Sequence, residues 1–487
     1  MTAHAHHPKA LWILTGSYAL FMAGAGCLLA STVLYASTVL KLPTQTAYGV
    51  FSAMLALFFI APLLGGYIAS QWGYKLATIL GLALAAVGLG CLSVPSLPMF
   101  YAGLAFFAVG NSFATPGVMC MIDLCYAKDD FRRESGFTIF YLIFNIGAVL
   151  GIFVGGAVAV HEGFFREFQM ASSCLVLAFL WLVLRHKDIV AHEGRSLDKQ
   201  VSWSFQRCLI SLICLSILML PVSLFLFQHL MFNDLLMIVL LISVVVFLIC
   251  KALRAQNPQR KRLLAFVFLA LISTVFWTLY ALEPSFLSVF VANNVDTHVW
   301  GVTLPAEAFF AFDGVFVILF GVVLSRIWFY LSTRHHNPSL VTKFSAALVI
   351  IGIGFTVLAL LVYGHGNATP FPAWGVIVAY AIFASGELLV GPLGISMVGS
   401  LSPDGMEGFL MGFWQVCMGF GSVIAGWIAM APNLPNSPLP LAVSNPLYIK
   451  VFWMVGAFAI LAGLLTFIVS RAVMRVMVEQ EPQLPQL

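Results

Sequence analysis

Three acidic residues, Glu283, Asp313 and Glu387, lie inside long apolar stretches with no Lys or Arg nearby in the sequence. An ionised carboxylate in hydrocarbon costs several kcal/mol or more, so such residues usually face a protein interior or an aqueous cavity. A pathway lined by acids alone should favour protons, amines or other cations.

The composition is that of a membrane protein. The 487 residues are 61% hydrophobic and 9% charged, with a mean hydropathy of +1.01, whereas a soluble domain carries about 25% charged residues. A membrane-spanning helix needs about 20 apolar residues. We predict fourteen spans, near 10–39, 48–72, 76–95, 98–125, 136–160, 168–185, 205–227, 233–253, 262–291, 306–331, 341–363, 371–400, 406–430 and 447–474.

The distribution of Lys and Arg predicts the orientation of these spans. With the N-terminus in the cytoplasm and the sides alternating, 20 of the 23 basic residues fall inside. Only Lys41, Arg166 and Lys450 remain outside. Cytoplasmic loops carry the excess of Lys and Arg, and a missed helix would scramble this split. We therefore expect both termini in the cytoplasm.

The spans are grouped unevenly along the chain. We expect a six-helix bundle over 1–185, a cytoplasmic linker over 186–204, an inserted helix pair over 205–254 and a second six-helix bundle over 255–487. Paired six-helix halves with a substrate held between them are the major facilitator design. The fold class expected is therefore an all-α polytopic membrane protein with a major facilitator fold. The inserted pair has no charge in its apolar centres and is expected to face lipid.

Three stretches resemble motifs of known transporters. Residues 65–75, GGYIASQWGYK, resemble the conserved cytoplasmic loop of the major facilitator superfamily, with Ser70 where an acid normally stands. Residues 129–147, DDFRRESGFTIFYLIFNIG, resemble the signature of the proton-coupled oligopeptide transporter family. Residues 386–414 resemble the Glu-bearing helix and the Trp-bearing helix of that family. The resemblance covers nearly the whole chain, and bacterial members also have an inserted helix pair.

The chain departs from that family where the family carries bases. The family's first helix has E-x-x-E-R and a further Arg, and its fourth helix has Lys-Pro-Asn. The corresponding residues here are Gly16, Ala19, Leu20, Cys27, Thr115 and Gly117. In the family, the bases receive the carboxylate of the peptide and the glutamates take part in proton coupling. The resemblance thus implies that the anion-holding part of the site is lost.

The residues that hold the peptide amine in the family are retained. The family's Glu matches Glu387 and one Asn matches Asn145, while a second Asn aligns with Asp313. We therefore predict substrate binding by Glu387, Asp313, Asn145, Trp414 and Tyr141. Each has a structural alternative: a backbone contact in a bend for Glu387, a capped kink for Asp313, a helix-to-helix hydrogen bond for Asn145, and core packing for the two aromatic residues.

Proton coupling and gating are assigned to other polar residues. Burial favours the neutral form of a carboxyl, so we predict that Glu283 or Asp313 carries a proton. Glu283 precedes Pro284 and could instead face a loop near the outer end. Asp123 with Arg132 and Arg133 is predicted to form a cytoplasmic ion pair that breaks on opening, or a static loop clamp.

These features predict a secondary active transporter of the inner membrane. The primary expectation is proton-coupled uptake of small peptides or peptide-like amine-bearing solutes by alternating access. The alternatives are a transporter, including an exporter, of a non-peptide amine or cation, and a non-transporting sensor. No catalytic, phosphate-binding or zinc-binding pattern is present in the sequence, so we expect no enzyme, cofactor, metal or nucleic-acid partner. The expected partners are the solute, protons and the lipid bilayer, and the expected state is a monomer.

Overall fold

The computed structural model describes residues 7–126, 132–189, 205–299, 301–333, 338–403, 406–432 and 439–478. In this part of the chain, 14 helices are long and apolar enough to cross a membrane. Each of them overlaps one of the predicted stretches. The predicted all-α membrane fold with 14 spans is therefore confirmed.

The chain forms two compact units. Unit 1 comprises Met1–Leu230 with Leu304–Gly314, and unit 2 comprises Met231–Thr303 with Val315–Leu487. The elements of unit 1 are α1 (Lys9–Leu34), η1 (Tyr35–Val39), α2 (Thr44–Trp72), α3 (Tyr74–Leu92), α4 (Leu97–Leu124), α5 (Arg132–Glu162), α6 (Phe164–Leu184), η2 (His186–Asp188), α7 (Phe205–Gln228) and η6 (Ala306–Phe310).

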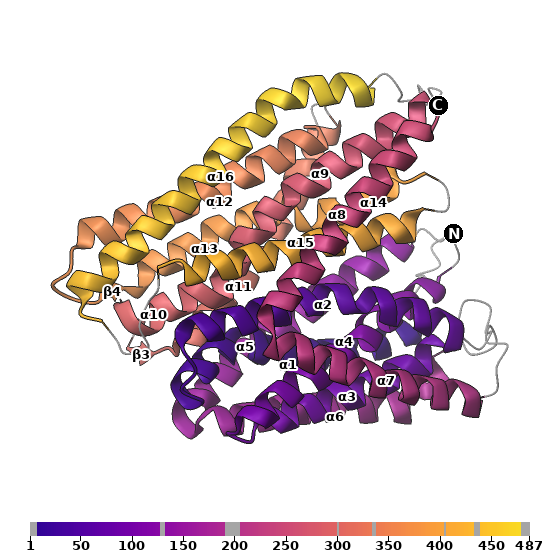
Figure 1. Cartoon of the computed structure of the whole chain (residues 1–487), viewed down its shortest axis with the longest axis horizontal. Helices are drawn as coiled ribbons and strands as arrows, with labels where there is room; N and C mark the ends of the chain where they lie inside the picture. The colour runs from indigo at the N-terminus through magenta and orange to yellow at the C-terminus, as the bar shows by residue number, and fades with distance from the viewer. Residues whose placement is uncertain are drawn as a thin grey trace, which may run out of the picture. The chain divides into compact units, whose positions relative to one another are not determined.

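The helices of unit 2 are α8 (Leu230–Arg254), α9 (Asn257–Ala281), η5 (Glu283–Leu287), α10 (Ser288–Asn294), α11 (Ala311–Thr333), α12 (Leu340–His365), α13 (Ala373–Glu387), α14 (Gly391–Leu401), α15 (Glu407–Met430) and α16 (Leu441–Val478). Its strands are β1 (Val295–Asp296), β2 (His298–Val299), β3 (Val302–Thr303) and β4 (Phe371–Pro372). Helices α12 and α16 run alongside each other for much of their length (Figure 1).

Glycines let the helices of unit 1 approach one another closely. A Cβ atom on Gly65 of α2 would overlap the backbone carbonyl of Ser112 in α4. Gly73 has a φ of 104° and alone separates α2 from α3, a conformation that favours glycine because other residues clash there. The glycines of the 65–75 stretch therefore set both a helix contact and a tight turn.

The two helices that we expected as an inserted pair belong to different units. In unit 1, α7 packs on α2 and α4 through Leu215, Met219 and Leu220. In unit 2, the ring of Phe247 in α8 lies 5.2 Å from that of Phe409 in α15. Both helices leave many large apolar side chains exposed, which suits a lipid environment.

Unit 2 has a broken helix where one continuous span was predicted. The stretch 371–400 folds as α13 and α14, separated by residues 388–390. Pro392 stands at the start of α14, where its missing N–H costs no helical bond. The break therefore falls directly after Glu387, the last residue of α13.

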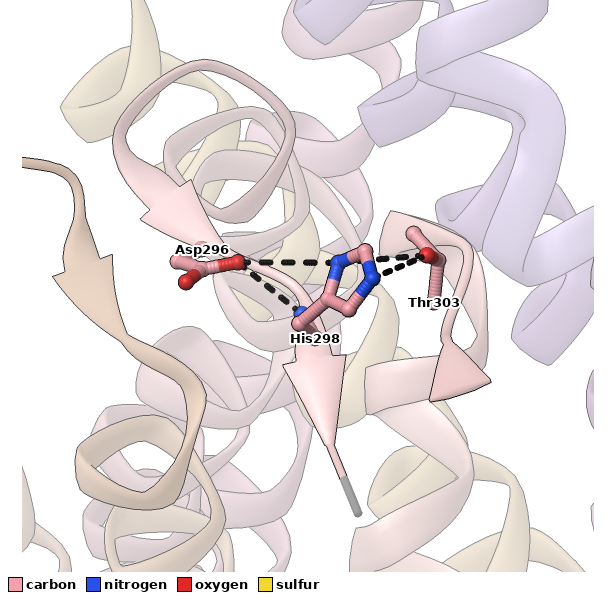
Figure 2. A network of polar contacts seen from close by, with 3 residues as sticks. All are labelled: Asp296, His298 and Thr303. Atoms are coloured by element: carbon pink, nitrogen blue, oxygen red, sulfur yellow. Dashed lines mark hydrogen bonds and ion pairs between the residues drawn. The ribbon is translucent and has the colours of Figure 1, made fainter. Parts of the chain in front are cut away.

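Four short strands lie outside the apolar spans. β1 pairs with β4 in parallel, and β2 pairs with β3 as an antiparallel hairpin. Asp296 Oδ1 accepts a hydrogen bond of 3.1 Å from the backbone N–H of His298, and the Thr303 hydroxyl lies 3.2 Å from the His298 ring (Figure 2). These exposed contacts order the hairpin that leads into the segment Leu304–Gly314.

Candidate functional site

Glu283 is fully buried in unit 2, at the first position of η5. Pro284 follows it and cannot donate a backbone hydrogen bond, so the helix widens at this point. The hydroxyl of Ser288 donates to the backbone carbonyl of Glu283 at 3.3 Å, but neither carboxylate oxygen has a hydrogen-bond partner among the described residues. Glu283 therefore lies in the protein interior rather than at an exposed loop.

Glu387 lies near Glu283 in the same unit. It is half-buried at the C-terminus of α13, and its carboxyl is close enough to that of Glu283 for their charges to interact. The backbone N–H of Val390 donates to the Glu387 carbonyl at 2.9 Å and closes the turn after the helix. A helix C-terminus carries partial negative charge. Two acids at such an end form a place that favours a cation or a proton.

Asp313 and Asn145 lie in unit 1. Asp313 is 3% exposed near the start of α11, and the next residue, Gly314, packs so closely on Val149 of α5 that a Cβ atom would overlap it. Asn145 is half-buried and donates from Nδ2 to the backbone carbonyl of Tyr141 at 2.8 Å. This bond lies within α5, so it is not the helix-to-helix bond that we considered for Asn145.

A neutral hydrogen-bond chain includes Thr115, the residue that we expected at the position of the family's Lys. Thr115 donates from Oγ1 to Asn111 Oδ1 at 2.7 Å, and Asn111 Nδ2 donates to the backbone carbonyl of Phe58 at 2.8 Å. Because the only hydroxyl proton of Thr115 is used in this way, the Tyr18 hydroxyl donates to Thr115 at 3.1 Å. Every donor in the chain thus points to an uncharged acceptor.

Gly117 lies two residues after Thr115 in α4 and packs against α3. A Cβ atom there would overlap the hydroxyl of Thr78. A residue with a Cβ atom at this position, such as the family's Asn, requires the Thr78 side chain to move. The absence of a side chain at Gly117 is therefore part of the packing between α3 and α4.

Aromatic rings surround the neutral chain. The ring of Tyr18 lies 5.4 Å from that of Phe21, 5.2 Å from that of Phe140 and 5.7 Å from that of Phe144. Tyr141 lies 5.0 Å from Phe144 in an edge-to-face contact. The chain is therefore set among apolar rings rather than among bases.

Trp414 is 2% exposed in α15. A Cβ atom on Gly394 of α14 would overlap its indole ring, and the ring of Phe344 lies 6.1 Å away. These contacts are those expected if Trp414 packs in the protein core, the structural alternative to substrate binding. It fixes α14 against α15.

The predicted cytoplasmic ion pair stays a prediction. Asp123 is half-buried in the last turn of α4. Arg132 and Arg133 begin α5, but their side chains lie outside the described residues.

Two buried acids were missed by the sequence reasoning. Glu167 of α6 is 0% exposed and Glu307 of η6 is 5% exposed. Both lie at the ends of apolar stretches, where an acid is normally solvated. The Phe-Phe pair at 164–165 was the available signal, because it extends the apolar stretch to the N-terminal side of Glu167. No cluster of three or more His, Cys, Asp or Glu residues that could hold a metal ion occurs in the described part of the chain.

Comparison with known proteins places these features in context. The model of the POT family matches residues 75–440. The dipeptide and tripeptide permease B of Yersinia enterocolitica is 26% identical over 426 residues, which cover 86% of this chain and 85% of that protein. A POT family transporter in complex with 5-aminolevulinic acid has a TM-score of 0.82 at 22% identity and covers 96% and 97% of the two chains. Tetrameric PepTSo2 has a TM-score of 0.84 at 21% identity, with 96% and 98% covered.

Proposed function

The chain belongs to the POT family, and we propose that it is a proton-coupled symporter that imports small peptides or peptide-like amine-bearing solutes by alternating access. The observation that carries the proposal is the close pair Glu283 and Glu387 at the broken helix of unit 2. The pair supplies a place for a cation and a place for a proton within one unit.

Glu387 would hold the amino group of the solute. A charge-assisted hydrogen bond between an ammonium group and a carboxylate is about twice as strong as a neutral one. The C-terminal end of α13 adds partial negative charge at the same point. Asp313, Asn145 and Tyr141 in unit 1 would add contacts to the solute, and Trp414 would hold the helix that follows Glu387 in place.

Glu283 would carry the proton. An ionised carboxylate without hydrogen-bond partners is costly in an apolar interior, so a proton would bind while Glu283 is closed off from water. It would leave when this part of unit 2 opens to the cytoplasm. Asp313 is a second candidate because it is also buried.

The chain is an integral membrane protein with 14 apolar helices among its described residues. We propose that it lies in the inner membrane with both termini in the cytoplasm, as the distribution of basic residues favours. Asp123, Arg132 and Arg133 would form its cytoplasmic gate. The working unit would be one chain.

Peptides are favoured over non-peptide amines as the solute. The relative from Yersinia enterocolitica is named a dipeptide and tripeptide permease, and the family match extends over most of the chain. The similarity to a permease and the family match also favour a transporter over a non-transporting sensor.

The proposal can be tested in proteoliposomes with an inward proton gradient. Labelled trialanine should accumulate, and Glu387→Gln should lower its uptake about tenfold or more, because the amide removes a charge-assisted bond worth about 1.4 kcal/mol or more. Glu162→Gln is the matched control, because the side chain of Glu162 is 62% exposed. Near-normal uptake by a well-expressed Glu387→Gln protein would remove Glu387 from the site. If a simple labelled amine accumulates and labelled trialanine does not, the non-peptide alternative is established.

A further inference from the structure

Unit 1 contains a buried acid that the proposed transport site does not use. Glu167 lies in the first turn of α6 and is 0% exposed. The hydroxyl of Ser31 in α1 donates to its Oε1 atom at 2.6 Å. Its Oε2 atom is buried and has no hydrogen-bond partner in the described part of the chain. A carboxylate held in this way is only half solvated by the protein.

A second buried acid, Glu307, lies beside it. Glu307 is 5% exposed and belongs to the segment Leu304–Gly314, which packs in unit 1 although unit 2 precedes and follows it in the sequence. Its carboxyl is close enough to that of Glu167 for the two charges to repel each other when both are ionised. One shared proton would remove this repulsion, as it does in other close carboxyl pairs.

Two adjacent glycines of α5 bring the acids and the segment together. A Cβ atom on Gly155 would lie 2.6 Å from Cys27 Sγ and 3.1 Å from Glu167 Oε1. A Cβ atom on Gly156 would lie 3.0 Å from Pro305 Cγ in the segment. Helix α5 therefore carries no side chain at the two positions where Glu167 and the segment Leu304–Gly314 contact it.

The buried titratable groups around the pair supply no positive charge in the described structure. The Cys27 thiol of α1 interacts with Glu167 and donates to the Gly151 carbonyl at 3.1 Å. Cys174 of α6 lies near Cys27, and Asp313 is a further buried acid on the same segment as Glu307. The next charged residues along α6 and α5, Arg166 and Glu162, are exposed and face each other at 3.9 Å.

We propose that Glu167 and Glu307 form a proton-binding pair that keeps the segment Leu304–Gly314 seated on α1 and α5. The pair carries one proton while the segment is docked. Loss of that proton leaves two adjacent buried carboxylates, and their repulsion releases the segment. The pair belongs to unit 1, whereas Glu283 and Glu387 belong to unit 2, and its action does not depend on which solute is carried.

Hydrogen exchange of the purified protein without substrate tests the proposal. In the wild type, amides of 304–314 should exchange at least about tenfold faster in mildly alkaline than in mildly acidic buffer, after correction for intrinsic exchange, which corresponds to about 1.4 kcal/mol. Glu167→Gln and Glu307→Gln each replace one acid by a neutral isostere and should keep the segment protected in both buffers. Glu162→Gln is the matched control, because it neutralises an acid of α5 whose side chain is 62% exposed, and it should keep the wild-type response.

The outcomes separate the proposal from its rivals and from the transport function. Protection of 304–314 that is independent of pH in the wild type would overturn it, and this result needs no variant to fold. A full pH response that survives in a folded Glu167→Gln protein would also overturn it. This experiment contains no substrate. Its result therefore stays valid even if the protein is found not to take up peptides.

Discussion

Amidation of the C-terminus of a peptide should hardly change its affinity for this transporter. At Thr115, where the resemblance implies a base for the peptide carboxylate, unit 1 has the neutral chain Tyr18, Thr115 and Asn111. The hydroxyl hydrogens of Tyr18 and Thr115 are already used in that chain, and the rings of Phe140 and Phe144 lie beside Tyr18. A carboxylate that enters this region finds no cation among the described residues of the chain.

The size of the effect follows from the kind of bond that is missing. A hydrogen bond to a charged group contributes about 1.5–3 kcal/mol, so a site with a base would lose about 10–150-fold in affinity when the carboxylate is amidated. In the neutral site we expect a change of less than about threefold, or about 0.65 kcal/mol. The two cases differ by more than the error of a competition assay.

The assay is competition for uptake of a labelled tripeptide by trialanine and by trialanine amide, at one pH. Thr115→Val is the control, because it keeps the shape of the side chain and removes the hydroxyl; it should leave the ratio of the two affinities unchanged. If the free carboxylate improves affinity tenfold or more in the wild type, a Lys or Arg side chain reaches the solute, and the reasoning from the neutral chain is wrong.

Three further predictions follow from particular residues. Gly117→Asn, which introduces the family's residue, should destabilise the protein by about 1–3 kcal/mol, because the new side chain overpacks against Thr78. The change should appear as a lower Tm in detergent. Gly16→Ala is the control and should leave the Tm unchanged, because nothing lies within 4 Å of its new Cβ atom. Glu283→Gln should abolish stimulation of uptake by a proton gradient while substrate exchange continues, and gradient-driven uptake at the wild-type rate would exclude Glu283 as the proton carrier. Tags at both ends should resist labelling from outside intact cells, and labelling of either tag would reverse the proposed orientation.

The number and type of the helices could be predicted because the bilayer imposes them. A span must be apolar for about 20 residues and must satisfy its own backbone hydrogen bonds. The break after Glu387 was not predicted, because residues 388–390 are as apolar as the helices on either side. Only Gly391 and Pro392 marked it. That the segment Leu304–Gly314 packs in unit 1 depends on contacts with residues far away in the sequence, which no local pattern contains.

Some residues of the candidate site could likewise be predicted from the sequence and others could not. Glu283, Asp313 and Glu387 could be found because each interrupts an apolar stretch, and all three are at least half-buried. Glu167 was missed because the sixth span was predicted to begin at residue 168, whereas α6 begins at Phe164. Gly163, with a φ of 87°, sets that beginning, and a helix start of this kind has no hydropathy signal.

Three of the buried acids coincide with interruptions of regular helix. Glu283 opens the widened turn η5, Glu387 ends α13 at a break, and Glu307 lies in the tight turn η6. Irregular backbone at membrane depth is tolerated where protein or a water-filled cavity surrounds it, and a buried acid carries a separate cost. In unit 1 and in unit 2, the irregular backbone and the buried acid therefore occur at the same residues. Such coincidence is expected where a site binds cations or protons and the backbone must move, and it is not needed for a helix that only crosses the membrane. The acids of the chain therefore mark the places where it is expected to work, independently of the family to which it belongs.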